Sequence, residues 1–476
     1  ATGGQSLGVK TDKAVALIPD FADSLLDLNV QGGGSGAALL EFARKSPVAA
    51  READTLAKLN LGGSGTFAFH LSLPLKKVED VQLQGTAQLK DADLAAPDWN
   101  LKLDKLNGPL RFDAHGLAVG PLDAGFRGQP SQLRMAIAAA NSDPATVFSA
   151  QLQGSYRMDE LVQGYASLNW LGQLAEGRSP FDIGFTIAHV PGSDALAQTL
   201  GIDSPLSGMA LDLPAPLDKS ATTDLPLHLT MSLPIGGSDL HVALGEVMRG
   251  HLRLSDGPQR PLTATLAFGN QLPSGLPDRG LRIRGHASQL DVTGWVQRAV
   301  AGSGGEGPGL ESIDVSTDQA GWFGRPMGPL KLRATPQPDV LSVDAEGAAM
   351  AGNFSVPTVD LDKRGVTARL QRLHWPKDST PPPGGRPAKP TTPTTPAIAG
   401  TAAVVPVVDP ANTGINPAAL PPFHLWVGDL RLGDAKLGEA RLETWPTANG
   451  LHIEQLRALS SRVQINASGD WNGNAS

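Results

Sequence analysis

The 476-residue chain contains no cysteine and only two tyrosines. Without cysteine it forms neither disulfides nor thiolate centres, and its redox compartment stays undetermined. It also lacks any run of about 18 apolar residues, the length that a membrane-spanning helix requires. The first residues, Ala1-Thr2-Gly3-Gly4, have no initiating Met and no basic segment leading into an apolar one. We therefore expect the chain to be a piece of a longer protein, with any anchor or export signal outside it.

Charged residues are scarce, at 18% of the chain, and the formal net charge is −8. A nucleic-acid scaffold needs clustered Lys and Arg to displace counterions from phosphates, so this balance argues against a nucleic-acid partner. Gly (55 residues) and Pro (39 residues) together make up about a fifth of the chain, well above average usage. Such a chain turns often.

Apolar side chains recur at every second position between residues 61 and 135. In residues 66–75 every odd position is apolar, and every even position except Ala68 is polar or Pro. The alternation returns in residues 81–89, 101–103 and 110–112, with Gly, Pro, Asn or Asp between the runs. A period of two is typical of strands with one apolar face. Closely spaced strands of this kind favour an antiparallel meander, so the fold class predicted is mainly β.

One face of the predicted sheet is apolar, and its function depends on what covers it. An ordinary sandwich or barrel core is one interpretation. The other is an uncovered trough, because the strands are many while the expected helices are few and short, and a large bare apolar face aggregates unless something fills it. The candidate lining residues are Phe67, Phe69, Leu71, Leu73, Val81, Leu83, Leu101, Leu103, Leu110, Phe112, Leu229, Met231 and Leu233.

Helices are expected at a few places between the strands. Ser35 is a candidate N-cap for a short helix, the start of a helical insert near residues 36–59. Between residues 157 and 176 apolar side chains recur every three or four positions, which predicts an amphipathic helix. Residues 194–201 and 290–300 are expected to be helical as well. Met158, Leu161, Tyr165 and Leu168 of the 157–176 helix are candidates for a gate over the apolar face.

The strand and helix patterns divide the chain into five segments. A Pro/Thr/Ala-rich stretch within them cannot pack a core and is expected to be an extended insertion. The segments are a first β segment (1–154), a helical segment (155–203), a second β segment (204–376), the Pro/Thr/Ala-rich insertion (377–422) and the start of a further β segment (423–476).

Motifs that carry chemistry are missing. Ser35, Ser64 and Ser303 lie among glycines, but none has Gly two residues to each side, as a nucleophile elbow requires. The Gly-rich residues 32–36 lack the Gly-Lys-Ser/Thr ending of a P-loop. The ten His residues form no HExxH motif and no pair at helical spacing, which argues against zinc.

The remaining polar candidates have structural interpretations. His70 and His228 fall on the polar faces of predicted strands, where they are expected to be solvated. Carboxylates such as Asp91 and Asp113 lie at strand ends and turns, where Asp is an ordinary choice, rather than forming an acid–base pair. The sequence therefore predicts no catalytic residue, no cofactor, no metal site and no enzyme.

Four segments, in the same order along the chain, resemble the YhdP branch of the AsmA-like family. Residues 204–219 match its pattern Ser-x-Leu-x-Gly-x-x-x-x-Leu-Pro-x-Pro-Leu-x-Lys, with Ser204, Gly208 and Lys219 at the Ser, Gly and Lys positions. Residues 106–117 resemble its Gly-x-Leu-x-Phe strand pair, residues 290–295 its Leu-Asp-x-x-x-Trp helix entry, and residues 425–438 the start of its carboxy-terminal part. The resemblance covers roughly residues 37–472.

The resemblance implies a long, twisted antiparallel β-groove that carries phospholipid across the periplasm between the inner and outer membranes. Phospholipid and the two membranes are the implied partners, with the membranes reached through parts outside this chain. The family carries an amino-terminal membrane helix that anchors it in the inner membrane, and no such helix is found here. A second interpretation stays open: a periplasmic scaffold for envelope proteins, resembling TamB-like proteins, in which the apolar face is an ordinary core.

Overall fold

The computed structural model describes residues 8–19, 25–45, 56–76, 80–97, 101–164, 169–234, 237–255, 262–273, 275–301, 309–377 and 420–472. Strands make up 66% and helices 8% of the structure, which confirms the mainly β class. The chain forms two compact units. Unit 1 contains Ala1–Asp212, Asp218–Gly245 and Leu252–Arg260, and unit 2 contains Leu213–Leu217, Glu246–His251 and Pro261–Ser476.

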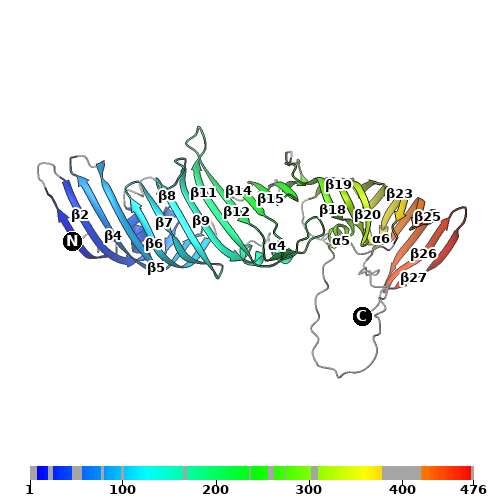
Figure 1. Ribbon diagram of the computed structural model, residues 1–476, viewed down its shortest axis with the longest axis horizontal. Coiled ribbons are helices and arrows are strands. Elements are labelled where there is room, and N and C mark those ends of the chain that lie inside the picture. The colour runs from blue at the N-terminus through cyan, green and yellow to red at the C-terminus, as the bar shows by residue number, and fades with distance from the viewer. Residues whose placement is uncertain are drawn as a thin grey trace, which may run out of the picture. The chain divides into compact units, whose positions relative to one another are not determined.

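The strands of unit 1 form an open antiparallel sheet (Figure 1). Consecutive strands of this sheet pair with each other, and the short β3 (Asn60–Leu61) pairs with β5 beyond the end of β4. Two short strands that intervene in the sequence, β10 (Ala175–Gly177) and β13 (Met209–Leu211), pair with each other instead. The paired order is β1 (Val9–Leu17), β2 (Leu25–Ser35), β4 (Ser64–Pro74), β5 (Gln82–Ala96), β6 (Leu101–Asp113), β7 (Gly116–Phe126), β8 (Gln129–Ala138), β9 (Thr146–Tyr156), β11 (Ser179–His189), β12 (Leu196–Ser204), β14 (Leu227–Leu233) and β15 (Asp239–Leu244).

The helices of unit 1 are short. Helix α1 (Gly36–Arg44) begins at the predicted N-cap, where Ser35 Oγ accepts a hydrogen bond from the Ala38 N–H at 3.3 Å. Helices α3 (Met158–Leu161) and α4 (Asn169–Leu174) follow β9. They precede a small two-stranded sheet of β10 (Ala175–Gly177) and β13 (Met209–Leu211).

The single helix predicted over residues 157–176 is wrong. The chain leaves α3 at a turn in which Gly164 has φ +92°, a conformation that an α-helix cannot contain. Residues 165–168 lie outside the described residues, and residues 175–177 are extended because they pair with β13. Apolar spacing alone did not reveal the glycine break.

The helix predicted over residues 194–201, and with it the helical character of residues 179–203, is also wrong. Residues 179–189 and 196–204 form β11 and β12, which pair with each other from Asp182–Asp203 to His189–Leu196. Ala, Leu and Gln near residues 195–200 favour a helix locally. Here β12 is hydrogen-bonded on both edges, to β11 and to β14, and the tertiary ladder overrides that propensity.

Unit 2 is a mixed sheet (Figure 1). Its pairing is antiparallel, as predicted, except that β17–β18, β18–β19 and β23–β24 are parallel. Parallel neighbours need a crossover, which α5 (Val292–Ala301) helps to supply between β18 and β19. The strands are β17 (Thr263–Phe268), β18 (Gly280–Asp291), β19 (Leu310–Trp322), β20 (Arg325–Pro336), β21 (Val340–Gly347), β22 (Met350–Pro357), β23 (Val366–Trp375), β24 (Phe423–Leu432), β25 (Ala435–Thr447), β26 (Gly450–Leu459) and β27 (Gln464–Asn472).

Helix α5 confirms the prediction for residues 290–300. The Asp291 carboxylate accepts from the Gly294 N–H at 2.9 Å, and the Trp295 indole donates to the Ala215 carbonyl at 2.8 Å. The remaining elements are β16 (Met248–Arg253) and the one-turn helix α6 (Leu361–Arg364). Most of the predicted Pro/Thr/Ala-rich insertion, residues 378–419, lies outside the described residues.

Candidate functional site

One face of the unit 1 sheet is apolar from strand to strand. Residues directly opposite each other in neighbouring strands share a face, so the register defines rows that cross the sheet. The row that we call the central row contains only apolar residues on ten successive strands: Phe67, Ala87, Leu110, Val119, Met135, Ala150, Phe185, Leu200, Met231 and Leu240.

The rows on either side of the central row continue the apolar face. On one side the row is Val30, Phe69, Gly85, Phe112, Leu117, Ile137, Phe148 and Ile187. On the other side it is Leu122, Leu133, Leu152, Ile183, Ile202, Leu229 and Val242. Gly85 leaves the space that the Phe112 ring occupies, because a Cβ at this position would overlap the ring.

The candidate lining residues lie on this face or at its margin. Phe67, Leu103 and Met231 are buried, and the other candidates are half-buried. Leu101 and Leu103 lie beyond an irregularity in the β5–β6 ladder, opposite Ala96 and Leu94. Val81 immediately precedes β5. The ladder therefore places on one face of the sheet residues that are up to 166 positions apart in the sequence, from Phe67 on β4 to Leu233 on β14.

Helix α1 covers the first strands of this face. Its Phe42 stacks on Phe67 and Phe69, with ring centroids 5.8 and 6.1 Å away, and its Leu40 packs against the larger apolar cluster around Leu103. Arg44 holds the chain that follows, donating to the carbonyls of Leu56 at 3.0 Å and Leu59 at 2.8 Å. The sequence predicted the helix but not that it packs onto the apolar face.

The face on β11, β12, β14 and β15 is less deeply covered. Ile183, Phe185, Leu200 and Ile202 are only half-buried, as are Leu229 and Val242. The described helices of unit 1 pack mainly elsewhere, α1 on β1 to β5 and α3 and α4 on β10. This part of the face combines apolar surface with partial solvent exposure.

Aromatic side chains pack together at one end of the strands β7, β9 and β11. The Tyr156 hydroxyl lies 2.6 Å from Ser131 Oγ, and its ring packs against Phe126 and Phe181 at 5.6 and 6.3 Å between centroids. Tyr156 is fully buried. Burial raises the pKa of its hydroxyl, opposed by the hydrogen bond with Ser131.

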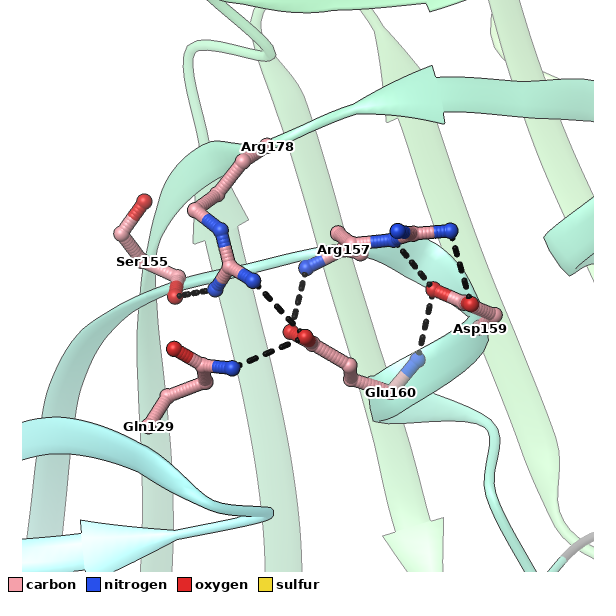
Figure 2. Close-up of polar contacts among 6 residues, drawn as sticks. All are labelled: Gln129, Ser155, Arg157, Asp159, Glu160 and Arg178. Carbon is pink, nitrogen blue, oxygen red and sulfur yellow. Dashed lines mark hydrogen bonds and ion pairs between the residues drawn. The ribbon is translucent and has the colours of Figure 1, made fainter.

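A polar network anchors α3 beside this end (Figure 2). The Glu160 carboxylate accepts from the Arg157 N–H at 2.9 Å, from the Gln129 side chain at 2.9 Å and from Arg178 at 2.7 Å. Of the four candidate gate residues, Met158 and Leu161 lie half-buried in α3. Tyr165 and Leu168 lie outside the described residues.

The opposite face of the sheet is polar. Thr86, Arg111 and Thr186 alternate with the apolar residues along their strands. His70 bonds Asp27 at 2.7 Å and His228 bonds Asp203 at 2.5 Å, both pairs crossing between strands. The two His side chains are 48% and 62% exposed, which confirms that they are solvated on the polar face.

Unit 2 carries an apolar face of its own, for which the sequence had supplied no candidates. The only sequence signal for this face was the alternation of apolar and polar residues along β19 to β26. That signal does not identify which residues share a row, because the pairing order of the strands and their bulges decide the alignment. Its most complete row is Leu266, Ile283, Ile313, Ala334, Val343, Phe354, Ala368, Leu425, Leu442 and Leu456.

Lys219 is buried, and its ammonium group donates hydrogen bonds to the surrounding backbone. It is 7% exposed, and its ammonium donates to the carbonyls of Met209 at 2.6 Å, Leu206 at 2.7 Å and Ser220 at 3.0 Å. Burial lowers its pKa. The Lys that ends the 204–219 motif therefore fixes the chain around β13.

The described residues contain no cluster of metal-ligating side chains. No group of three or more His, Asp or Glu side chains among the described residues is arranged to hold a metal ion. Within the same residues, every helix is too short or too polar to cross a membrane. An open sheet with few helices and one apolar face in each unit is the architecture of a β-groove protein.

Comparison with known proteins agrees with the assignment to the β-groove class. The chain belongs to the YhdP family, because the family model described as "YhdP protein" matches residues 1–476. It is 24% identical over 239 residues to the intermembrane phospholipid transporter YhdP of Escherichia coli strain K12. This match covers 48% of the chain and 18% of the relative's length. No solved structure matches the chain.

Proposed function

We propose that the apolar faces hold the acyl chains of phospholipids, and that this chain forms part of a periplasmic path between the inner and outer membranes. The observation that carries the proposal is the central row, which stays apolar on ten successive strands of unit 1. The name of the E. coli relative, an intermembrane phospholipid transporter, supports phospholipid as the ligand.

The energetic need for such a face is large. Each acyl CH₂ exposed to water costs about 0.8 kcal/mol. A two-chain lipid with roughly thirty of them therefore faces a penalty on the order of 20 kcal/mol outside a membrane. A face that is apolar from strand to strand removes much of this penalty at every position. No single position then holds the lipid tightly, as transport requires.

In this account the chain moves lipid without changing it chemically. The headgroup stays in water at the edge formed by the strand ends, while the chains lie on the apolar face. The amino-terminal anchor in the inner membrane, a feature of the family, would lie outside this chain. Helix α3, carrying Met158 and Leu161 at the end of β9, is the proposed gate element of unit 1.

The test is lipid extraction from the purified chain beside two variants of neighbouring residues on β12. Leu200 belongs to the central row, and Thr199 points to the polar face. We expect phospholipid to copurify with the wild type and with Thr199→Asp, and to be lost from Leu200→Asp. Circular dichroism and thermal unfolding check that both variants fold.

A lipid-free wild type that remains soluble and folded would contradict the proposal. The apolar face would then be an ordinary core, and a scaffold for envelope proteins would be the better account.

A further inference from the structure

The turn between β7 and β8 carries an unusual residue. Phe126 pairs with Gln129, so Arg127 and Gly128 form a two-residue turn in which both have positive φ, 53° and 76°. This is the type I′ hairpin turn, whose first position favours Asn, Asp or Gly. A long side chain at positive φ is disfavoured, and strain of this kind is frequent at functional sites. Turn geometry therefore gives no reason for an arginine here.

The Arg127 guanidinium lies at the end of the apolar face. Its central carbon is 5.4 Å from the centroid of the Phe126 ring, and Phe126 packs against the main apolar cluster of unit 1. The Nε of Arg127 is buried and has no hydrogen-bond acceptor among the described residues. A buried donor without an acceptor is costly, which points to an acceptor that the protein itself does not supply.

Two other arginines at the same ends of the strands are already neutralised. Arg157 bonds Asp159 at 3.0 Å and Arg178 bonds Glu160 at 2.7 Å (Figure 2). Within the described part of the chain, Arg127 has no such carboxylate partner, and its guanidinium lies over the Phe126 ring. A planar guanidinium next to an apolar surface fits an anion with several oxygens.

We propose that Arg127 binds the phosphodiester of a phospholipid whose acyl chains lie on the apolar face beside Phe126. The inference rests on the proposed function and assigns the headgroup contact within it. Free phosphate offers the same oxygens, but the position of Arg127 against Phe126 favours a phosphate attached to acyl chains. The occupant is thus an amphiphile rather than an ion.

The experiment is a competition between two lipids with identical acyl chains. The purified chain is incubated with vesicles that contain equal amounts of phosphatidylglycerol and diacylglycerol, recovered by gel filtration, and its bound lipids are quantified by mass spectrometry. Inorganic phosphate is added in a parallel sample. The variants are Arg127→Asn, which suits a type I′ turn, and Arg134→Asn, which removes the same charge from an exposed position on β8.

We expect the wild type and Arg134→Asn to prefer phosphatidylglycerol about tenfold, the size of one hydrogen-bonded charge contact. Arg127→Asn should lose this preference while keeping its bound diacylglycerol and its melting temperature. Inorganic phosphate at millimolar concentration should not displace the phospholipid.

Three results would overturn the assignment. Equal binding of both lipids by the wild type would remove the headgroup contact but leave the apolar lipid face intact. Displacement of the phospholipid by inorganic phosphate would identify a plain anion site. Binding of neither lipid would overturn this inference together with the proposed function.

Discussion

Phe42 of α1 stacks on Phe67 of β4, with their ring centroids 5.8 Å apart and their planes inclined by 16°. Phe67 begins the central row of unit 1, so the chain covers one end of its own apolar face with its own helix. On the later strands, Phe185, Leu200 and Leu240 of the same row are half-buried. Helix α1 therefore packs over the first strands of this face, while these three residues of the later strands stay partly exposed to solvent.

Replacing Phe42 with Ala should destabilise unit 1 by about 1–3 kcal/mol, somewhat less than a fully buried Phe because its ring is half-buried. Urea unfolding measures the change. The variant should also bind a fluorescent apolar probe more strongly, because Phe67 and Phe69 become accessible. Lys45→Ala, an exposed change next to the same helix, serves as the control and should alter neither property.

Replacing Glu160 with Gln should loosen α3. The Glu160 carboxylate joins Gln129, the Arg157 N–H and Arg178, and loss of a charged acceptor of this kind costs about 1–3 kcal/mol. Hydrogen exchange of residues 158–162 should become faster. Asp159→Asn is the matched control, because the exposed pair of Asp159 with Arg157 is worth only about 0–1 kcal/mol. Equal exchange rates in both variants would show that Glu160 does not anchor the helix.

Replacing Lys219 with Met should destabilise unit 1 by about 2–4 kcal/mol, since it leaves three carbonyl oxygens without their donor. The shape of the side chain is nearly conserved, so the effect reports the hydrogen bonds rather than a cavity. Thermal unfolding measures it, with Asp218→Asn as the neighbouring exposed control. A variant as stable as the wild type would mean that water replaces the ammonium without loss.

Acid should weaken unit 2 through Glu443. The Arg441 guanidinium, and to a lesser extent His424, hold the pKa of this carboxyl below its ordinary value of 4.5. A lowered folded-state pKa contributes stability that is present above pH 4.5 and is lost as the pH falls through the folded value. The free energy of unfolding should therefore decrease below about pH 4.5, and Glu443→Gln should reduce that decrease. Urea titrations between pH 3 and 7 test this, and identical pH profiles would contradict it.

The period-two alternation was enough to predict the mainly β fold class and the apolar face of the sheet near Phe67. Ser35, as a candidate N-cap, was enough to locate the start of α1. Long-range pairing was not accessible in the same way. Residues 196–200 have helix-favouring side chains, and only the two partner strands make them extended. In unit 2, bulges shift the register between strands, so the residues that share a row could not be read from the sequence. The type I′ turn that gives Arg127 its positive φ depends on the pairing of Phe126 with Gln129. Each of these features is a property of neighbouring strands rather than of a local sequence.

The most direct test of the apolar face is site-specific photocrosslinking along β12 in the presence of phospholipid vesicles. A photoreactive amino acid replaces Thr199, Leu200, Gly201 or Ile202 in turn, and lipid adducts are measured by mass spectrometry. Because neighbouring residues of a strand point to opposite faces, phospholipid should attach at positions 200 and 202 and not at 199 and 201. Equal labelling at all four positions, or none at 200 and 202, would contradict a lipid path on this face.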